Sequence, residues 1–276
     1  MSRRTISLLV LLLLCVPCWA GNDFSSDPNC KALWNFEGLA DGVWLQDSIG
    51  TNTLVSDQAE VDTVKYKTGI ASLYLDDQSS GLYQLDTNLD SRFPLRSDDA
   101  VKKFSICFWV RFDLFNINDN VIFAKWDTQY ARTIALVFLS PGDPYQLCGY
   151  LGYEGGASFE TMSLHSGELE TAVWYHVGFT YDDSDKSYRV RCWDSNDVQL
   201  LAADVTGNTT NNINVEAGAD WCLGRMNSTP NSFTGNMDEV VVFDRILTAD
   251  EIDEIRAGTF GASAGGQVVP LMITGD

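Results

Sequence analysis

The chain has 276 residues, of which 38 are acidic and 18 are lysine or arginine, giving a formal net charge of −20. Such an acidic surface repels nucleic acids and anionic lipids, so it excludes the usual electrostatic footprint of a polyanion-binding protein. An acidic surface is compatible with binding of calcium or of a neutral ligand. The alternative is that the acidity serves only to keep the protein soluble.

Residues 1–20 have the composition of a signal peptide. Two arginines precede an apolar run at residues 6–16, and small Ala20 stands before Gly21 at the expected cleavage point. That run is too short to span a membrane, and no later segment is long and apolar enough to do so. We therefore expect a secreted or extracytoplasmic chain without a membrane span. Its 16 basic and 38 acidic residues would give a net charge of about −22.

Signals for short strands dominate the rest of the chain. In residues 104–112, Phe104, Ile106, Phe108 and Val110 alternate and would share one face. Similar runs occur at 133–139, 145–153, 174–181, 187–193 and 237–243, with turn-forming residues between them. The last run ends in an apolar stretch typical of a strand that is buried on both faces. The spacing predicts an all-β protein, an antiparallel β-sandwich of the jelly-roll kind.

One short helix is expected near the C-terminus. Thr248 and Glu251 form a capping box, and Leu247 and Ile252 are placed for a hydrophobic staple across it. Gly258 supplies the stop, so the helix has roughly ten residues. We expect an N-terminal extension at 21–29, one domain at 30–257 and a flexible tail at 258–276.

Seven short motifs follow one another within residues 30–257. They are Leu33–Gly38, Asp47–Gly50, Gly69–Asp76, Phe104–Val110, Trp174–Val177, Gly235–Val240 and Leu247–Ile252. In this order they resemble the laminin G-like domains of the bacterial and pentraxin-related kind, within the concanavalin A-like lectin and glucanase superfamily. The resemblance implies the fold more strongly than the function, because that superfamily includes lectins, adhesion modules and glycosidases.

Five cysteines remain after removal of the signal: Cys30, Cys107, Cys148, Cys192 and Cys222. In an oxidising compartment we expect one or two disulfides, and the odd count leaves at least one thiol over. Pentraxins have a cysteine where Cys107 stands, but the resemblance puts Gly178 at the partner position. Cys192, on the expected neighbouring strand, is a possible substitute.

Catalytic residues are not predicted. Family-16 glycoside hydrolases, which share the fold implied by the resemblance, carry Glu-X-Asp-X-X-Glu on one strand. The local counterpart, Glu251-Ile-Asp-Glu254, has the wrong spacing and falls on the expected helix. His176 is expected to be structural, and no Gly-X-Ser-X-Gly motif is present.

Acidic loop residues suggest a structural Ca²⁺, since calcium prefers several oxygen ligands. Glu37, Asp41 and Asp47 lie in or near the opening strand and its loop. If the first and last strands pair, as is common in jelly-roll modules, Asp238 would join them. The alternative is that these carboxylates cap turns or accept backbone hydrogen bonds. The acidic run at 182–185 is expected to be a plain hairpin turn.

A set of aromatic residues suggests a ligand platform, because such rings stack on the apolar faces of pyranoses. Trp126 and Tyr130 lie in a segment polar enough to be an exposed loop, and Tyr150 and Tyr153 lie on a strand spaced by glycines. Trp193 ends its own strand beside polar residues.

The sequence therefore predicts a secreted, non-catalytic module that binds a glycan or an extracellular protein and is calcium-stabilised. Two alternatives remain open: a glycoside hydrolase of the same superfamily, and a purely structural surface or matrix domain.

Overall fold

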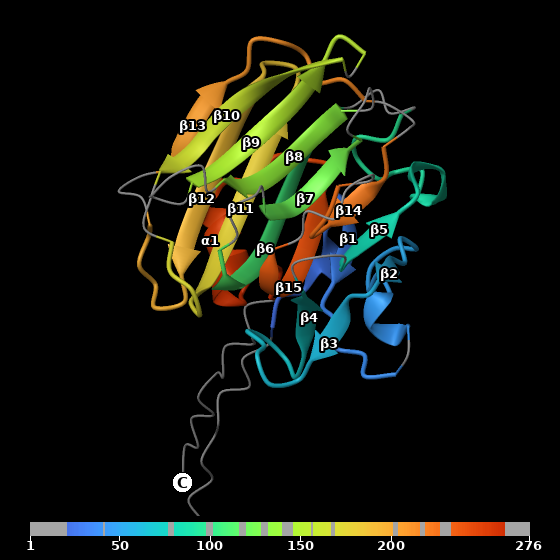
Figure 1. Cartoon of the computed structure of the whole chain (residues 1–276), viewed down its shortest axis with the longest axis vertical. Helices are drawn as coiled ribbons and strands as arrows, with labels where there is room; N and C mark the ends of the chain where they lie inside the picture. Colours follow the sequence, from blue (N-terminus) through green and yellow to red (C-terminus); the bar gives the residue numbers. More distant parts are fainter. Residues whose placement is uncertain are drawn as a thin grey trace, which may run out of the picture.

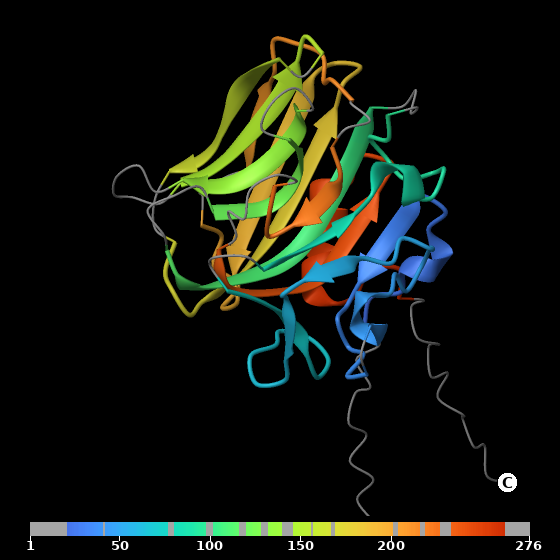
Figure 2. The ribbon, with the colours of Figure 1, turned by 45° about the vertical axis from the view of Figure 1, so that its right-hand side comes forward.

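The computed structural model describes residues 21–40, 42–76, 80–97, 102–115, 120–127, 132–139, 146–155, 157–166, 169–200, 204–215, 219–226 and 233–262. These residues form two antiparallel sheets stacked face to face, with one helix behind the larger sheet (Figures 1 and 2). The predicted all-β sandwich with one short C-terminal helix is confirmed. Among the described residues, no helix has the length and apolar character needed to cross a membrane.

The larger sheet has the strand order β13-β12-β11-β6-β15-β4-β3, and β1 pairs with part of β15. Its strands are β1 (Cys30–Trp34), β3 (Glu60–Asp62), β4 (Ser72–Leu75), β6 (Lys103–Leu114), β11 (Trp174–Asp182), β12 (Ser187–Asp194), β13 (Val205–Asn208) and β15 (Thr234–Phe243).

The smaller sheet has the order β10-β9-β8-β7-β14-β5-β2. Its strands are β2 (Val55–Asp57), β5 (Gly81–Gln84), β7 (Asn120–Trp126), β8 (Arg132–Leu139), β9 (Gln146–Tyr153), β10 (Ser158–Ser166) and β14 (Trp221–Leu223). Three 3₁₀ turns, η1 (Phe24–Ser26), η2 (Val43–Leu45) and η3 (Asp86–Asn88), lie in the connections.

The main core fills the space between the two sheets. The predicted alternation in β6 holds, because Phe104, Ile106, Phe108 and Val110 all face this core and are fully buried. Trp221 on β14 meets them from the smaller sheet, with its ring 6.5 Å from that of Phe104. Truncating a buried phenylalanine in such a core costs about 3–5 kcal/mol of unfolding free energy.

Strand β15 changes partner halfway along its length. Residues 235–237 pair with β4, whereas residues 240–243 pair with β1 on the same side. The register against β6 shifts between Asp238 and Val241, and Glu239 there has a φ of 51°. The first and last strands of the sandwich therefore pair as predicted. The bulge turns the Asp238 and Glu239 side chains away from the regular alternation.

Helix α1 (Ala249–Ala257) packs on the outer face of the larger sheet. Thr248 and Glu251 form the predicted capping box, and Gly258 ends the helix with a φ of 72°. Leu247 and Ile252 lie together in a second apolar cluster beneath the helix. A Cβ at Gly178 would stand 2.5 Å from the Ile252 Cγ2 atom, so a glycine in β11 permits this close approach.

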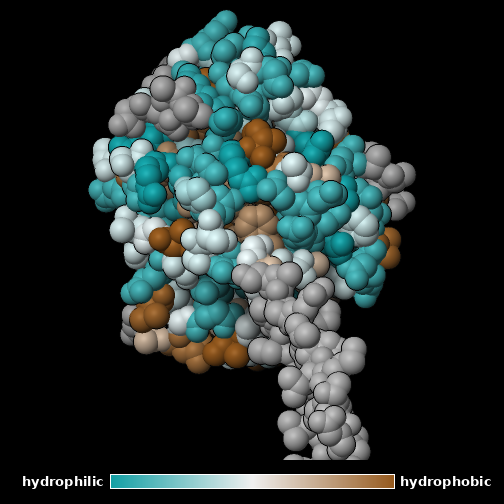
Figure 3. Space-filling view, turned by 180° about the vertical axis from the view of Figure 1, so that it is seen from behind, coloured by the Kyte–Doolittle hydropathy of each residue, from teal (hydrophilic) through white to brown (hydrophobic). Residues whose placement is uncertain are grey.

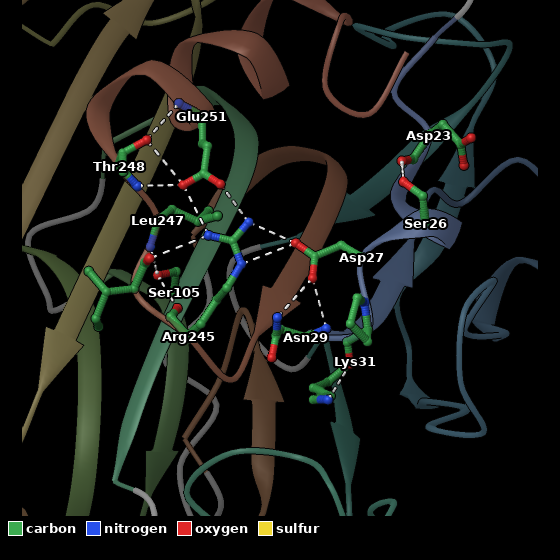
Figure 4. A network of polar contacts seen from close by, with 12 residues as sticks. Asp23, Ser26, Asp27, Asn29, Lys31, Ser105, Arg245, Leu247, Thr248 and Glu251 are labelled. Atoms are coloured by element: carbon green, nitrogen blue, oxygen red, sulfur yellow. Dashed lines mark hydrogen bonds and ion pairs between the residues drawn. The ribbon is translucent and has the colours of Figure 1, made fainter. Parts of the chain in front are cut away.

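The start of α1 is also tied to the N-terminal segment through one arginine (Figure 4). The Arg245 guanidinium donates to both Asp27, at 2.7 Å, and Glu251, at 2.7 Å. Hydrogen bonds from Arg245 hold the pKa of Glu251 below its usual value. Ser105 on β6 donates to the Arg245 carbonyl and accepts from the Leu247 N–H. The Glu251 carboxylate is therefore fully engaged in holding the helix.

Aromatic residues from both sides of the 30–257 segment pack into the same cluster as α1. Phe24 and Phe260 are buried, with ring centroids 5.4 Å apart, and both contact Phe243 of β15. Asn22 joins them by accepting from the Phe260 N–H. The packed unit therefore includes residues 22–29 and 258–260.

The predicted disulfides are wrong. All five cysteines are buried thiols and none is bonded to another. Cys107 faces the helix side of the larger sheet while Cys192 faces the core, so the two lie on opposite faces of one sheet. Cys30 and Cys107 have β15 between their strands, and β7 and β8 separate Cys148 from Cys222. Intervening strands of about 4.8 Å each keep these pairs beyond the reach of a disulfide.

Candidate functional site

The outer face of the smaller sheet carries an aromatic cluster. The rings of Trp126, Tyr150 and Phe159, from β7, β9 and β10, meet pairwise with centroids 5.5–6.0 Å apart. The contacts to Phe159 are edge-to-face, the geometry that aromatic pairs prefer. Trp126 is 6% exposed, but Phe159 is 47% exposed and presents its ring to solvent. The cluster thus fixes one exposed ring on a buried base.

Arg132, at the start of β8, completes this cluster. Its guanidinium lies 5.6 Å from the centroid of Trp126 and 5.4 Å from that of Phe159, and it donates to the Ala157 carbonyl. Gly152 faces Phe159 across the β9–β10 pair, and a Cβ there would lie 2.0 Å from the Arg132 carbonyl oxygen. The glycine spacing of β9 therefore lets the backbones of β8 and β9 approach closely under the rings.

A small polar pocket lies on the same sheet. It has a volume of about 280 Å³ and is lined by Ser56, Asp57, Tyr83, Asp220 and Arg225. The Arg225 guanidinium lies 5.7 Å from the Tyr83 ring centroid and forms an ion pair with Asp57. Burial raises the pKa of Asp220 above its usual value. The pocket therefore combines an aromatic ring with a hydroxyl, carboxylates and a guanidinium. We refer to it below as the Tyr83 pocket.

One row of cross-strand pairs connects the pocket with the aromatic cluster. Tyr83 pairs with Cys222, Cys222 with Ala124, Ala124 with Ala135, and Ala135 with Tyr150. Directly opposed residues point to the same face of a sheet, so all five lie on its outer side, where Cys222, Ala124 and Ala135 are fully buried. Four steps between neighbouring strands separate Tyr83 from Tyr150, a distance of about 19 Å.

A buried ion pair supports this face from inside the sandwich. Lys125, next to Trp126 on β7, is completely buried and donates to Asp86 at 2.6 Å and to the Ala219 carbonyl at 2.7 Å. The Asp86 N–H in turn donates to Asp220. Removing one partner of such a pair leaves an uncompensated buried charge, at a cost of about 3–5 kcal/mol. The ion pair thus fixes the position of β7. Through the hydrogen bond from Asp86 to Asp220 it also fixes the residue before β14 that lines the Tyr83 pocket.

The five predicted ligand residues do not form one group. Trp126 and Tyr150 come together, although Trp126 ends a strand and is buried, so its predicted place in an exposed loop is wrong. Tyr153 lies three residues beyond Tyr150 on β9, an odd step that turns it to the other side of the sheet. Trp193 lies on the larger sheet, and Tyr130 falls outside the described residues.

Trp193 belongs instead to a packed row on the back of the molecule. Arg256 from α1 covers its ring at 4.3 Å, and Lys67 covers Trp109 at the same distance. His176 stands between the two tryptophans, pairing with both. It is fully buried, and burial lowers its pKa to about 3. This histidine is therefore neutral and inaccessible, as a structural residue would be.

The predicted calcium ligands also separate. Asp47 accepts from the Leu33, Ile49 and Asn52 N–H groups, so its carboxylate organises its own loop. Asp41 falls outside the described residues. Glu37 and Asp238 come close together and support consecutive parts of the segment at residues 67–70, through N–H groups of residues 67, 68 and 70.

Glu239 is a third acid beside Glu37 and Asp238 that the sequence did not single out. Burial, with repulsion from the neighbouring acids, raises the pKa of Asp238 and of Glu239 to about 7. The Asp238 Oδ1 atom is buried and has no hydrogen-bond partner among the described residues. Within the same part of the chain, no set of three or more His, Cys, Asp or Glu side chains is arranged to hold a metal ion.

A larger groove of about 790 Å³ lies on the opposite side of the molecule, between β11–β13 and the start of α1. Its aromatic lining residue, Tyr188, packs against the core between the sheets. The back face that carries α1 is mainly hydrophilic, and hydrophobic areas reach its lower edge (Figure 3). Exposed apolar side chains near η2 and in the turn between β3 and β4 include Val43, Val64 and Ile70.

The two stacked antiparallel sheets, with first and last strands paired, define a jelly-roll β-sandwich. Residues 85–253 match the family described as the concanavalin A-like lectin/glucanases superfamily, and the chain belongs to this family. The resemblance inferred from the seven motifs is therefore confirmed. A comparison with curated proteins finds no match.

Three solved structures are similar to this chain at low sequence identity. The binding domain of Paraclostridial Mosquitocidal Protein 1 is 12% identical with a TM-score of 0.58, over 82% of this chain and 51% of that one. A pentraxin from Limulus polyphemus is 18% identical (TM-score 0.41; 56% and 70% covered). The Ruminococcus gnavus IT-sialidase CBM40 is 14% identical (TM-score 0.48; 68% and 95% covered). This chain thus spans about half the length of the mosquitocidal binding domain.

Proposed function

We propose that this chain is an extracytoplasmic module without catalysis that binds a glycan on the outer face of its smaller sheet. The observation that carries the proposal is the half-exposed ring of Phe159, fixed by Trp126 and Tyr150. An aromatic ring stacks on the apolar face of a pyranose, while nearby polar groups bind its hydroxyls. The Arg132 guanidinium, 5.4 Å from the Phe159 ring centroid, is such a polar group.

The rigid packing of Phe159 distinguishes it from an exposed apolar side chain that has no binding role. A single exposed apolar residue is normal in soluble proteins. Phe159, in contrast, contacts two rings and a guanidinium. Its orientation is therefore set before a ligand arrives, which lowers the entropy lost on binding.

A glycoside hydrolase is the second candidate, and one observation favours it. Asp57 and Asp220 line the same pocket, and burial raises the pKa of Asp220, as a general acid requires. Binding is the better-supported function because the Asp57 carboxylate is held in an ion pair with Arg225. A nucleophile or base would need that carboxylate to face the substrate.

A protein-binding role rests on the exposed apolar residues near η2 and the β3–β4 turn, among which Val64 is 84% exposed. Three exposed aliphatic side chains supply less specific recognition than a fixed aromatic cluster with a guanidinium beside it. We therefore prefer glycan binding, and Val64→Ser serves as a control in its test.

The experiment is a glycan array probed with residues 21–276 as wild type and as Phe159→Ala, Val64→Ser and Val198→Ala. Val198 is 59% exposed and lies at a distance, in the segment after β12, so it is the matched control. We expect binding in the wild type and both control variants, with a loss of at least about tenfold in Phe159→Ala. Equal binding by all four proteins, or none by the wild type, would reject the proposal.

Catalysis is tested on the same samples by measuring new reducing ends from each glycan that binds. The proposal expects none over many hours. Turnover that disappears in Asp220→Asn would instead establish the hydrolase.

A structural Ca²⁺ remains part of this proposal, now centred on Glu37, Asp238 and Glu239. The support for it is the unpartnered, buried Oδ1 atom of Asp238 and the repulsion among three neighbouring acids, which a cation would relieve.

A further inference from the structure

We propose that the side chains of Lys125 and Asp86 join in a covalent amide, or isopeptide, bond that forms without a cofactor once the chain has folded. The bond would tie β7 to the connection between β5 and β6, in a domain whose five buried cysteines form no disulfide. It is a modification of the core, so it does not depend on glycan binding at the outer face.

Lys125 lies on the inner side of β7, where its surroundings are apolar. It is fully buried, and it pairs across the strands with Trp221 of β14 and Ile134 of β8, both in the main core. Phe123, two residues earlier on β7, packs against Trp221 with ring centroids 4.3 Å apart. An ammonium in such a place is poorly solvated, so burial lowers the pKa of Lys125. The neutral amine, which is the nucleophilic form of lysine, is therefore favoured here.

Asp86, in η3, brings a carboxyl group into contact with this amine. The Lys125 Nζ atom lies 2.6 Å from the Asp86 Oδ1 atom, and Asp86 is 3% exposed. Groups held with their reacting atoms about 3–3.5 Å apart reach effective concentrations of about 10⁵–10⁸ M. Condensation of an amine with a carboxylic acid is unfavourable between separate molecules in water. At such an effective concentration it becomes favourable, and forming the amide also removes two charges from the core.

Hydrogen bonds hold both reacting groups in place. The Lys125 Nζ atom also donates to the Ala219 carbonyl at 2.7 Å. The Ser97 hydroxyl donates to the Asp86 Oδ2 atom at 2.7 Å, and the Asp86 N–H donates to Asp220 at 3.3 Å. The two carboxyl oxygens of Asp86 therefore have different partners: Oδ1 contacts the amine, and Oδ2 contacts a hydroxyl.

This arrangement assigns a role to each oxygen in a step whose only other product is water. A proton passes from Nζ of Lys125 to Oδ1 of Asp86, which leaves an amine and a carboxylic acid. The Nζ lone pair then attacks the carboxyl carbon, and the Ser97 hydroxyl stabilises the negative charge that develops on Oδ2. A second proton from Nζ reaches Oδ1, the bond from carbon to Oδ1 breaks, and Oδ1 leaves as water. Oδ2 remains as the amide oxygen.

A second buried lysine provides a matched comparison. Lys31 is 6% exposed and forms an ion pair with Asp244 at 3.0 Å, but the Asp244 side chain is 30% exposed. Water can solvate that carboxylate, so its ionised form is stable and the pair has less to gain from condensation. We therefore expect Lys31 to keep its free amine.

The test is mass spectrometry of recombinant residues 21–276 after denaturation. The intact wild type should be lighter than its sequence by the mass of one water. Trypsin should release a branched peptide that joins residues 68–92 to residues 112–132 and is uncut after Lys125. Fragment spectra should place the link between Lys125 and Asp86. A succinimide at Asp41-Gly42 would cause the same mass loss, but it would give no branched peptide.

Two variants complete the experiment. Lys125→Met should have its full sequence mass and no branched peptide, whereas the matched control Lys31→Met should keep both the mass loss and the branched peptide. The fragment spectra of the wild type assign the link by themselves, so the conclusion does not depend on whether Lys125→Met folds.

A wild type of full sequence mass would overturn this inference. So would a water loss that persists in Lys125→Met, or fragment spectra that place the link at Lys31 or at any pair other than Lys125 and Asp86. In each of these cases the proposed function survives, because Phe159 is on the outer face. Failure of the glycan array, in turn, leaves the mass measurement unaffected.

Discussion

Asp238 and Glu239 are two adjacent acids whose position within a bulge sets their chemistry. The bulge in β15 places both beside Glu37 in a region shielded from water, so burial raises the pKa of each to about 7. The side chain of Lys67, whose backbone N–H donates to Asp238, lies over Trp109, and burial lowers the pKa of this lysine. Protonation or a bound cation would therefore stabilise this junction.

Asp238 gives the first prediction, on stability against pH. An acid whose pKa is raised from 3.8 to about 7 on folding binds more protons in the folded state, so its contribution to stability falls as pH rises through this window. His176, with its pKa lowered from 6.5 to about 3, acts in the opposite direction. The comparison with Asp238→Asn isolates the acid. In chelator, the variant's unfolding free energy should improve relative to wild type between pH 5 and 8. Parallel curves from urea denaturation would contradict this.

The same residue gives the prediction on metal. Millimolar Ca²⁺ at pH 8 should raise the melting temperature of the wild type, because a ligand that binds only the folded state stabilises it. Asp238→Asn should lose most of this shift, whereas Asp182→Asn, at the end of β11 where its carboxylate accepts from the Ser184 N–H, should keep it. Identical melting of the wild type in calcium and in chelator would exclude the site.

The residues of the binding face were partly predictable. Trp126 and Tyr150 stood out as aromatics beside polar or glycine-rich sequence, and the structure brings them together. Phe159 did not stand out, because a lone phenylalanine among polar residues carries no sign of which ring it will contact. Tyr83 and Asp220 are 137 positions apart and meet only through the pairing of β5 with β14. No local pattern encodes that contact.

At the scale of elements, helix α1 was the most accurately predicted. Its capping box, staple and terminal glycine are local signals, and all three are present. Strands β7, β10 and β14 were not predicted, for identifiable reasons. In β7 a charged residue, Lys125, interrupts the apolar sequence pattern, and β14 is only three residues long. In β10 most residues other than Phe159 and Met162 are polar. Pairing with neighbouring strands, and not the intrinsic β-propensity of the residues, defines these strands.

The packing of α1 on β11 gives a prediction at this scale. Gly178→Ala should destabilise the chain by about 1–3 kcal/mol, because the new Cβ would meet the Ile252 side chain at 2.5 Å. In the Ile252→Ala background the same change should cost much less. Gly21→Ala, which meets nothing within 4 Å, is the neutral control. A Gly178→Ala cost that is unchanged in the Ile252→Ala background would show that the helix does not approach the sheet as described.

At the scale of the whole molecule, the pairing state of the cysteines could not be predicted from the sequence. Their number and an expected oxidising compartment favoured disulfides, but pairing depends on which face and which strand each cysteine occupies. The structure spreads Cys107, Cys192 and Cys222 over three different faces. Each is buried, and burial raises the pKa of the Cys192 and Cys222 thiols to about 12.

These buried thiols should be inert in the native protein. Iodoacetamide at pH 8 should label none of the five cysteines of residues 21–276 within an hour, because the reactive thiolate is absent and access is blocked. After unfolding in guanidinium without reductant, all five should label. Fewer than five labels, with an intact disulfide found by mass spectrometry, would contradict the described packing.

The two outer faces of the sandwich differ in how far they are covered. The back of the larger sheet is closed by α1, its Arg245 network and the cations over Trp109 and Trp193. The outer face of the smaller sheet instead leaves Phe159 half exposed and carries a separate polar pocket. Burial of the back face stabilises the fold, whereas the outer face of the smaller sheet presents Phe159, the residue proposed to bind.

A crystal structure of residues 21–276 with a bound oligosaccharide tests most directly which face of the sandwich binds the glycan. The account predicts a sugar ring stacked on Phe159, with the back of the larger sheet unoccupied. An oligosaccharide seated instead in the groove between β11–β13 and α1, beside Arg189 and Thr206, would contradict it.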